Sequence, residues 1–264
     1  MQKQTCSAAK TAMLIIISPA KKMRSDDSLP WEALPFFLPQ TEELLHTLRQ
    51  KTPEELRQLW KCNEQIAALN VERLAHMDLH RSLTPALLAY EGIQYQYMAP
   101  GVFTGEQFAY VQEHLRILSG FYGVLQPMDG VTPYRLEMQT KLPVQGQKDL
   151  YAYWGSRLAE HLFAQTDCIV NLASKEYSLC VSKYLPPHVR FVTCVFGEEI
   201  NGKVVEKGTM CKMARGEMVR FMAENNITDP AGLKAFDRLY YRYLPERSDE
   251  NTYVFLLDKK SRVL

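Results

Sequence analysis

Hydrophobic residues along this chain fall into short continuous runs and into longer stripes with helical spacing. Residues 14–17 form a continuous apolar run, which is typical of a strand buried on both faces. The runs at 168–172 and 253–257 indicate two more strands. Helical spacing predicts helices at 41–77, 106–115, 150–164, 175–184 and 210–224. The order is neither a regular strand–helix alternation nor all-helical, so we predict a single α+β domain with a mixed sheet covered by helices.

Turn residues add further elements. Thr52-Pro53 followed by Glu55 predicts a helix start inside the first helical region, and Asn201-Gly202 predicts a β-hairpin. The helix at 210–224, its turn and a short helix at 230–236 resemble a helix–hairpin–helix unit, although a plain helix pair has the same pattern. We also expect an extended loop at 26–40, a helix at 84–90, an irregular segment at 92–105, and short strands at 117–118, 124–125 and 134–138.

Length and net charge limit the number of domains and the kinds of protein that this chain can be. The 264 residues are 46% hydrophobic, enough for the core of one domain, which we place at 13–264. Residues 1–12 are polar and patternless, and we interpret them as a disordered or added extension. No apolar run approaches the roughly 18 residues of a membrane span. The net charge of +1 excludes a histone-like nucleic-acid binder but leaves room for a local basic groove.

The cysteines and histidines predict neither disulfides nor a metal site. The six cysteines include no CxxC pair and are spread along the chain, which indicates reduced thiols in the cytoplasm, mostly in the core. His76 and His80 are four residues apart, a spacing that can present two ligands on a helix, but no third ligand follows. We therefore expect two surface histidines. No nucleotide or cofactor fingerprint occurs, so we expect no metal and no cofactor.

The first segment with candidate chemistry follows the strand at 14–17. Ser18, Pro19, Ala20, Lys21 and Lys22 come directly after it. Open sheets bind ligands at the ends of their strands, so Ser18 could hold an oxyanion while Lys21 supplies charge. The alternative is two solvated lysines after a strand.

A second segment contains a charged pair in the predicted strand at 134–138. Arg135 and Glu137 share one face of that strand, and its apolar residues share the other. Lys141 follows shortly after. This arrangement suits a partly buried site, and the alternative is an ion pair that fixes a turn.

A third segment joins the strand at 168–172 to a helix. Asn171 ends the strand, Ser174 stands where it can cap the helix, and Glu176 and Tyr177 lie in the first turn. Helix N-termini attract anions, but an ordinary capped helix has the same residues.

The helix at 210–224 carries the fourth segment. Lys212 and Arg215 are three residues apart and share a helix face. Gly216 in mid-helix indicates the close approach of another backbone or of a ligand.

These segments together resemble the YaaA family of bacterial peroxide-stress proteins over about residues 13–257. The resemblance is carried by SPAK at 18–21, RILSG-x-YG at 116–123, PYRLEM at 133–138, TKL at 140–142, NLAS-x-EY at 171–177 and ARG at 214–216. It implies a cytoplasmic α+β protein of unusual topology with a helix–hairpin–helix element and a basic cleft that binds duplex or distorted DNA. It also implies a role in peroxide stress, where members limit free intracellular iron and oxidative damage.

Three positions depart from the family pattern. Gln126 stands where the family has Arg, Gln139 where it has Gly, and Tyr240-Tyr241 where it has Gly-Tyr. We expect the first change to remove a cation from the cleft, and the other two to change backbone freedom.

The leading hypothesis is therefore a DNA-binding peroxide-stress protein. Its cations lie on separate segments rather than on one recognition helix, so we expect contacts to phosphates without sequence readout. The candidate DNA- or anion-binding residues are Ser18, Lys21, Lys22, Arg135, Lys141, Asn171, Ser174, Lys212 and Arg215.

The alternative is an enzyme that acts on a small anionic or nucleotide-like substrate in the same cleft. Carboxylates beside cations have tuned pKa values, so Glu137, Glu176 and Tyr177 are the catalytic candidates, with Lys21 or Arg215 as anion clamp. A third hypothesis, direct iron sequestration, lacks a ligand cluster. The first two require Lys21, Arg135, Glu176 and Arg215 to surround one hollow.

Overall fold

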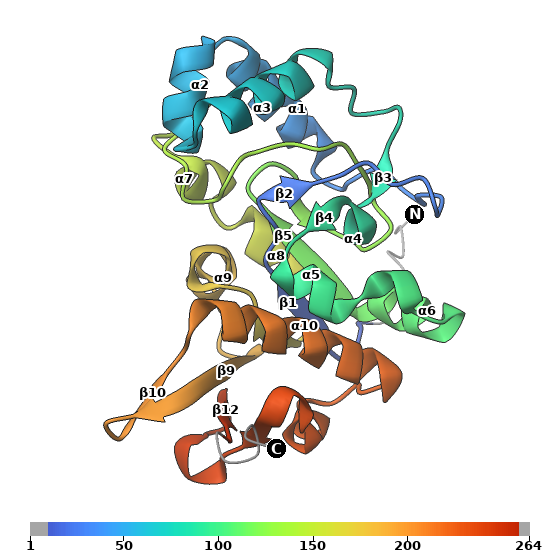
Figure 1. The fold of residues 1–264 in the computed structure, drawn as a ribbon, viewed down its shortest axis with the longest axis vertical. Coiled ribbons are helices and arrows are strands. Elements are labelled where there is room, and N and C mark those ends of the chain that lie inside the picture. The colour runs from blue at the N-terminus through green and yellow to red at the C-terminus, as the bar shows by residue number, and fades with distance from the viewer. Residues whose placement is uncertain (1–9, 259–264) are drawn as a thin grey trace, which may run out of the picture.

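An eight-stranded mixed sheet runs through the middle of the molecule (Figure 1). The computed structural model describes residues 10–258, and its strand order is β11-β12-β9-β8-β1-β5-β6, with β10 paired to β9. The five strands from β12 to β5 are mutually parallel, and β11 and β6 are antiparallel edges. The predicted α+β fold with a mixed sheet is confirmed. The strands are β1 Leu14–Ile17, β5 Leu115–Ser119, β6 Gly123–Leu125, β8 Cys168–Leu172, β9 Arg190–Ile200, β10 Lys203–Val205, β11 Tyr241–Tyr243 and β12 Thr252–Leu257.

The strand order reverses at β1. The chain passes from β1 to its neighbour β5 on one side, and later places β8 on the other side of β1, with β9 and β12 beyond. Ile17 at the end of β1 therefore lies between Ile117 of β5 and Leu172 of β8. Such a reversal opens a crevice outside the carboxyl ends of the strands, where open parallel sheets bind ligands. We call the β1–β8 boundary the switch point.

Three helices form a cap at the top of Figure 1, where one helical region at 41–77 was expected. They are α1 Leu38–Arg49, α2 Pro53–Trp60 and α3 Glu64–His76. The expected helix start is confirmed as a capping box, in which Thr52 Oγ1 accepts from Glu55 N at 3.2 Å and Glu55 Oε2 accepts from Thr52 N at 2.7 Å. Lys61 adopts a left-handed φ of 46° and ends α2, which the hydrophobic spacing did not reveal.

A short helix replaces the irregular segment that we predicted at 92–105. This helix, α5 Ile93–Met98, packs along α10 Gly208–Glu224. A Cβ at Gly216 would lie 2.1 Å from the backbone oxygen of Gln94, so glycine lets the two backbones meet. The close approach indicated by Gly216 is confirmed, with a backbone as the neighbour. Six residues are too few for a periodic signal, and α5 is stabilised by this contact instead.

Most other predicted helices and strands are present, but they begin and end at other residues than predicted. The remaining helices are α4 Ala86–Ala89, α6 Gly105–His114, α7 Leu150–Trp154, α8 Arg157–Phe163, α9 Lys175–Ser182, and the 3-10 helices η1 Pro100–Val102, η2 Pro230–Ala235, η3 Arg238–Tyr240 and η4 Pro245–Arg247. Two further strand pairs are β2 Lys22–Met23 with β4 Tyr90–Glu91, and β3 Thr84–Pro85 with β7 Gly130–Val131. The predicted hairpin is confirmed, since Asn201 and Gly202 turn with φ values of 52° and 74° between β9 and β10.

One expectation is wrong, and two others stay predictions. Residues 134–138 pair with no strand, although Leu136 and Met138 are buried as the alternation requires. The second helix of the expected helix–hairpin–helix unit is η2, a 3-10 helix, so that unit stays a prediction. Residues 1–9 of the expected extension lie outside the described residues. The end of that extension contacts the domain, since Thr11 N donates to Gln165 O at 2.8 Å.

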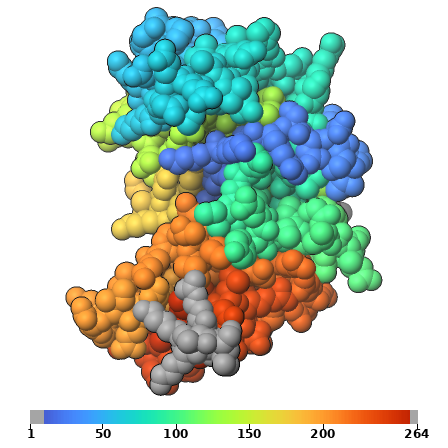
Figure 2. Space-filling model, viewed as in Figure 1, coloured from blue at the N-terminus to red at the C-terminus, as the bar shows by residue number. Residues whose placement is uncertain are grey.

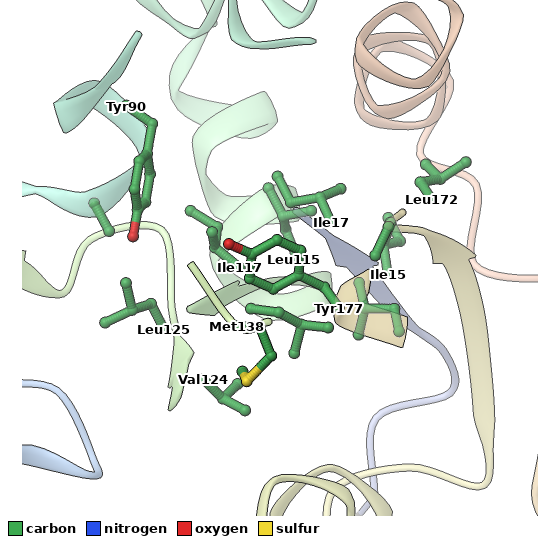
Figure 3. Packing of buried hydrophobic residues seen from close by; sticks show 14 of the residues in the cluster. Ile15, Ile17, Tyr90, Leu115, Ile117, Val124, Leu125, Met138, Leu172 and Tyr177 are labelled. Carbon is green, nitrogen blue, oxygen red and sulfur yellow. The ribbon is translucent and has the colours of Figure 1, made fainter. Parts of the chain in front are cut away.

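The core is centred on β1 and its two neighbours. All four residues of β1 are fully buried, and Figure 3 shows Ile15 and Ile17 among Leu115, Leu172 and the ring of Tyr177. Burying each such side chain contributes about 1.5–3 kcal/mol, so this continuous apolar packing fixes the strands whose ends form the crevice.

Candidate functional site

A cleft of about 400 Å³ lies at the carboxyl ends of β1 and β8. In Figure 2 its bounding segments meet on the face shown: the residues after β1 in blue, α9 in yellow and the start of α10 in orange. It brings together the four side chains that we expect around one hollow. Ten of the predicted site residues line it, namely Ser18, Lys21, Lys22, Arg135, Glu137, Ser174, Glu176, Tyr177, Lys212 and Arg215.

Ser18 and Ser174 tie the two strand ends together at the bottom of the cleft. Ser18 Oγ accepts from Ser174 N at 2.8 Å and lies 3.2 Å from Ser174 Oγ. The hydroxyl of Tyr95 on α5 donates to Ser18 O at 3.0 Å. Ser174 occupies the N-cap position of α9, but its side chain makes no capping hydrogen bond. Both hydroxyls therefore hold the cleft in shape.

Glu137 lies between two cations. Lys21 Nζ is 2.8 Å from Glu137 Oε2, and Arg135 Nη2 is 3.3 Å from Glu137 Oε1. The side chains of Arg135 and Glu137 are only 11% and 16% exposed, whereas that of Lys21 is 65% exposed. Water screens the inner pair poorly, so this carboxylate holds the two cations at one position in the cleft.

Glu176 and Tyr177 begin α9 on the other wall. Gln139 N donates to Glu176 Oε1 at 3.2 Å. Burial raises the pKa of Glu176, and the nearby charge of Glu137 raises it further. Burial also raises the pKa of Tyr177 well above its ordinary value, so its phenol stays neutral. Burial therefore favours the protonated form of the Glu176 carboxyl.

The cations of α10 complete the cleft. Arg215 is 13% exposed and its Nη2 is 3.4 Å from Glu206 Oε1. Lys212 makes no ion pair within residues 10–258. Lys22 on β2 pairs with Glu91 at 2.8 Å. Lys212 is therefore the cleft cation that is least neutralised by its surroundings.

A second cleft of about 440 Å³ continues the first. Lys21 and Glu137 line both, so the two form one groove, and Lys141 lines the second part. Lys51 and Lys61 also line it, at the two ends of α2, and no motif at these positions pointed to a site. The groove has eight cationic and four acidic lining residues: Lys21, Lys22, Lys51, Lys61, Arg135, Lys141, Lys212 and Arg215, and Glu55, Glu91, Glu137 and Glu176.

Asn171 does not line the groove, contrary to its predicted role. Its carboxamide is buried, accepting from Ala173 N at 3.0 Å and donating to Thr193 Oγ1 at 3.3 Å. Asn171 therefore orients the chain that leaves β8.

The other polar clusters show no assembled metal site. Within residues 10–258, no group of three or more His, Cys, Asp or Glu side chains could hold a metal ion. His80 lies beyond the end of α3, with Nε2 3.3 Å from Glu42 Oε1, so His76 and His80 are separate surface histidines. Burial raises the thiol pKa of Cys194 and Cys211 to about 12, so these thiols are protonated. No helix between residues 10 and 258 has the length and apolarity to cross a membrane.

The sequence was also compared with known protein families. A family model described as "Peroxide stress protein YaaA" matches residues 13–247. The chain belongs to the YaaA family. Among its relatives are a protein named UPF0246 in Agathobacter rectalis, 55% identical over 244 residues, and one in Lachnoclostridium phytofermentans, 55% identical over 245 residues. These matches cover 92% of this chain and 98% and 96% of the two relatives.

Two departures from the YaaA pattern now have structural explanations. Gln126 lines a separate small cavity with Arg116 and Asp129 that shares no lining residue with the groove, so the expected loss of a groove cation is wrong. Tyr240 has a φ of 63°, in the left-handed region that favours glycine, which accounts for the glycine of the family pattern there. Gln139 is not among the residues with positive φ, and it lines the groove.

Proposed function

We propose that this YaaA-family protein binds DNA, duplex or distorted, through the groove. The observation that supports this most is the groove lining itself, where eight cations from separate segments face four glutamates although the whole chain has a net charge of only +1. Phosphates are bound by such clustered cations. Because the cations are spread over loops, strand β2 and helix α10, they match a phosphate backbone better than a row of base edges.

Binding is therefore expected to be independent of sequence and strongly dependent on salt. Each phosphate contact releases a condensed counterion from the DNA, so affinity falls as salt rises. The protein would act in the cytoplasm, where bacterial DNA lies. Fluorescence anisotropy with a labelled duplex and a bubble-containing duplex tests the proposal directly.

The expected result is comparable affinity for unrelated sequences and weaker binding by Lys21→Ala and Arg215→Ala. Both side chains line the cleft, and removing either deletes one cation. An affinity that stays constant across salt concentrations would exclude phosphate binding in the groove.

The peroxide-stress role would include limiting free iron and oxidative damage to DNA, as the family resemblance implies. Iron and hydrogen peroxide together damage DNA, so a protein that lies on DNA acts where that damage occurs. Chelatable iron in cells lacking the protein should rise under peroxide and return to normal on complementation. Unchanged iron would remove this part of the proposal.

A second candidate function is an enzyme on a small anionic or nucleotide-like substrate. It is favoured by two carboxylates in different surroundings, since Glu137 is paired with Lys21 and Arg135 whereas burial raises the pKa of Glu176. In such an enzyme Glu176, whose pKa is raised, is the candidate general acid, and Glu137 holds the two cations in place. Screening nucleotides for turnover, with Glu176→Gln as the inactive variant, tests it, and turnover that survives this change would contradict the assignment.

A further inference from the structure

Three residues that line the cleft each carry a buried hydrogen-bond donor without a partner. Among the described residues, Gln94 Nε2, Arg135 Nε and Arg215 Nε are buried and have no hydrogen-bond partner. All three residues line the cleft at the switch point, and Gln94 is only 7% exposed. A buried donor without a partner costs about 1–3 kcal/mol. A ligand that offers acceptors at this position would remove that cost.

Apolar and aromatic residues also line this cleft. Tyr95, Tyr134, Leu136 and Tyr177 line the same cleft. Phosphate groups alone would gain nothing from such walls, whereas a flat ring packs well against aromatic side chains. The lining therefore indicates a ligand with a planar, acceptor-rich ring as well as an anionic group.

The size and the charged rim agree with a single nucleotide. The cleft of about 400 Å³ falls within the range typical of small-ligand sites and is too small for a duplex. The lysines at the rim are well exposed, with Lys21 at 65% and Lys22 at 75% of their side chains. The groove continues from Lys21 toward Lys141, which offers a path for a connected strand.

We propose that the cleft takes up one nucleotide unit, with the base among the three donors and the phosphate at the rim lysines. Two of the three donors belong to arginines, which favours guanine, with its acceptors N7 and O6 side by side, over adenine, which presents an amino group beside N7. The unit can come from DNA, extruded from the stack, or from a free nucleotide. The DNA source rests on the function proposed above, and the experiments separate the two sources.

Calorimetric titration with dGMP and dAMP tests the base preference. We expect wild-type protein to bind dGMP about tenfold more tightly than dAMP, and Gln94→Leu to weaken dGMP binding about tenfold through the lost hydrogen bond. Gln50→Leu, an exposed position outside the cleft, is the matched control and should bind normally. If Gln94→Leu does not fold, Arg135→Met removes another donor. Equal binding of the two nucleotides, or dGMP binding unaffected by the loss of a donor, would overturn the proposal.

A duplex with a fluorescent guanine analogue at a mismatch tests extrusion from DNA. We expect its fluorescence to change when wild-type protein binds, and to change less with Gln94→Leu. Duplex binding without this change and without dGMP binding would overturn the nucleotide site and leave the DNA-binding function standing. Binding of dGMP without duplex binding would support the site and overturn the DNA proposal. Loss of both would overturn both.

Discussion

At the scale of single residues, Glu137 is the point where the charges of the groove meet. It lies in both parts of the groove and contacts Lys21 and Arg135. Single hydrogen bonds fix the surrounding chain. For example, Ser18 Oγ accepts from Ser174 N and so joins the ends of β1 and β8. The site therefore depends on small residues as much as on charged ones. Two substitutions, at Gly216 and at Tyr240, test the backbone geometry of single residues.

Gly216→Ala should destabilise the protein by about 1–3 kcal/mol, as overpacking of a tight contact does. The added Cβ would lie 2.1 Å from Gln94 O, so α5 and α10 must move apart. Chemical denaturation measures the effect. Gly208→Ala is the control, since its Cβ meets nothing within 4 Å and the change should be neutral or stabilising. Equal stability of the two variants would show that the helices do not meet this closely.

Tyr240→Gly should stabilise the protein by about 0.5–1 kcal/mol, because it relieves a left-handed backbone conformation. Tyr240 has a φ of 63° and is 45% exposed, so little packing is lost. The melting temperatures of Tyr240→Gly and Tyr240→Ala are compared. Both variants lose the packing of the tyrosine ring, but only glycine relieves the strain of the left-handed backbone, because alanine keeps a Cβ. A glycine variant no more stable than the alanine variant would contradict this explanation.

At the scale of elements, apolar runs were sufficient to predict β1, β8 and β12, and the turn pair Asn201-Gly202 was sufficient to predict the hairpin of β9 and β10. A continuous apolar run or a two-residue turn depends only on neighbouring residues, so it can be recognised without knowledge of the tertiary structure. The pattern failed for α5, which is stabilised by a tertiary contact, and for the separation of α2 from α3, which depends on the left-handed residue Lys61. The motifs after β1 and β8 could be recognised by their place at strand ends, whereas Lys51 and Lys61, at the two ends of α2, carry no motif and join the groove only in the folded molecule.

The turn after β6 carries a pH-dependent element. Burial raises the pKa of Asp129 to about 7 from its ordinary value of 3.8, and its Oδ2 accepts from Gln126 N at 2.8 Å. The folded protein therefore holds this proton more tightly than the unfolded chain does. The resulting stability is fully present below about pH 4 and is lost as the pH rises through about 7.

Asp129→Asn should remove this pH dependence, because the amide keeps an acceptor and does not ionise. The free energy of unfolding of wild-type protein minus that of the variant should fall by about 1.4 kcal/mol for each pH unit between about pH 4 and pH 7, and should level off above pH 7. Denaturant titrations at several pH values measure it. A difference that stays constant with pH would contradict the raised pKa.

At the scale of the whole molecule, the reversal of strand order sets where the chemistry lies. The switch point brings together motifs from 18–22, 134–137, 174–177 and 212–215, which are far apart in the chain. The three-helix cap extends the same groove with further lysines. A nearly neutral protein thus concentrates its positive charge along one path, which is what a phosphate backbone requires.

The most direct measurement is the slope of log affinity against log salt for duplex DNA. Lys212→Ala and Lys141→Ala each remove a groove cation with no ion pair within residues 10–258, and each should reduce the magnitude of the slope by about 0.9. Lys10→Ala makes the same change in net charge beside Asp167, away from the groove, and should leave the slope unchanged. A slope near zero for wild-type protein, or an equal effect of all three changes, would contradict DNA binding through the groove.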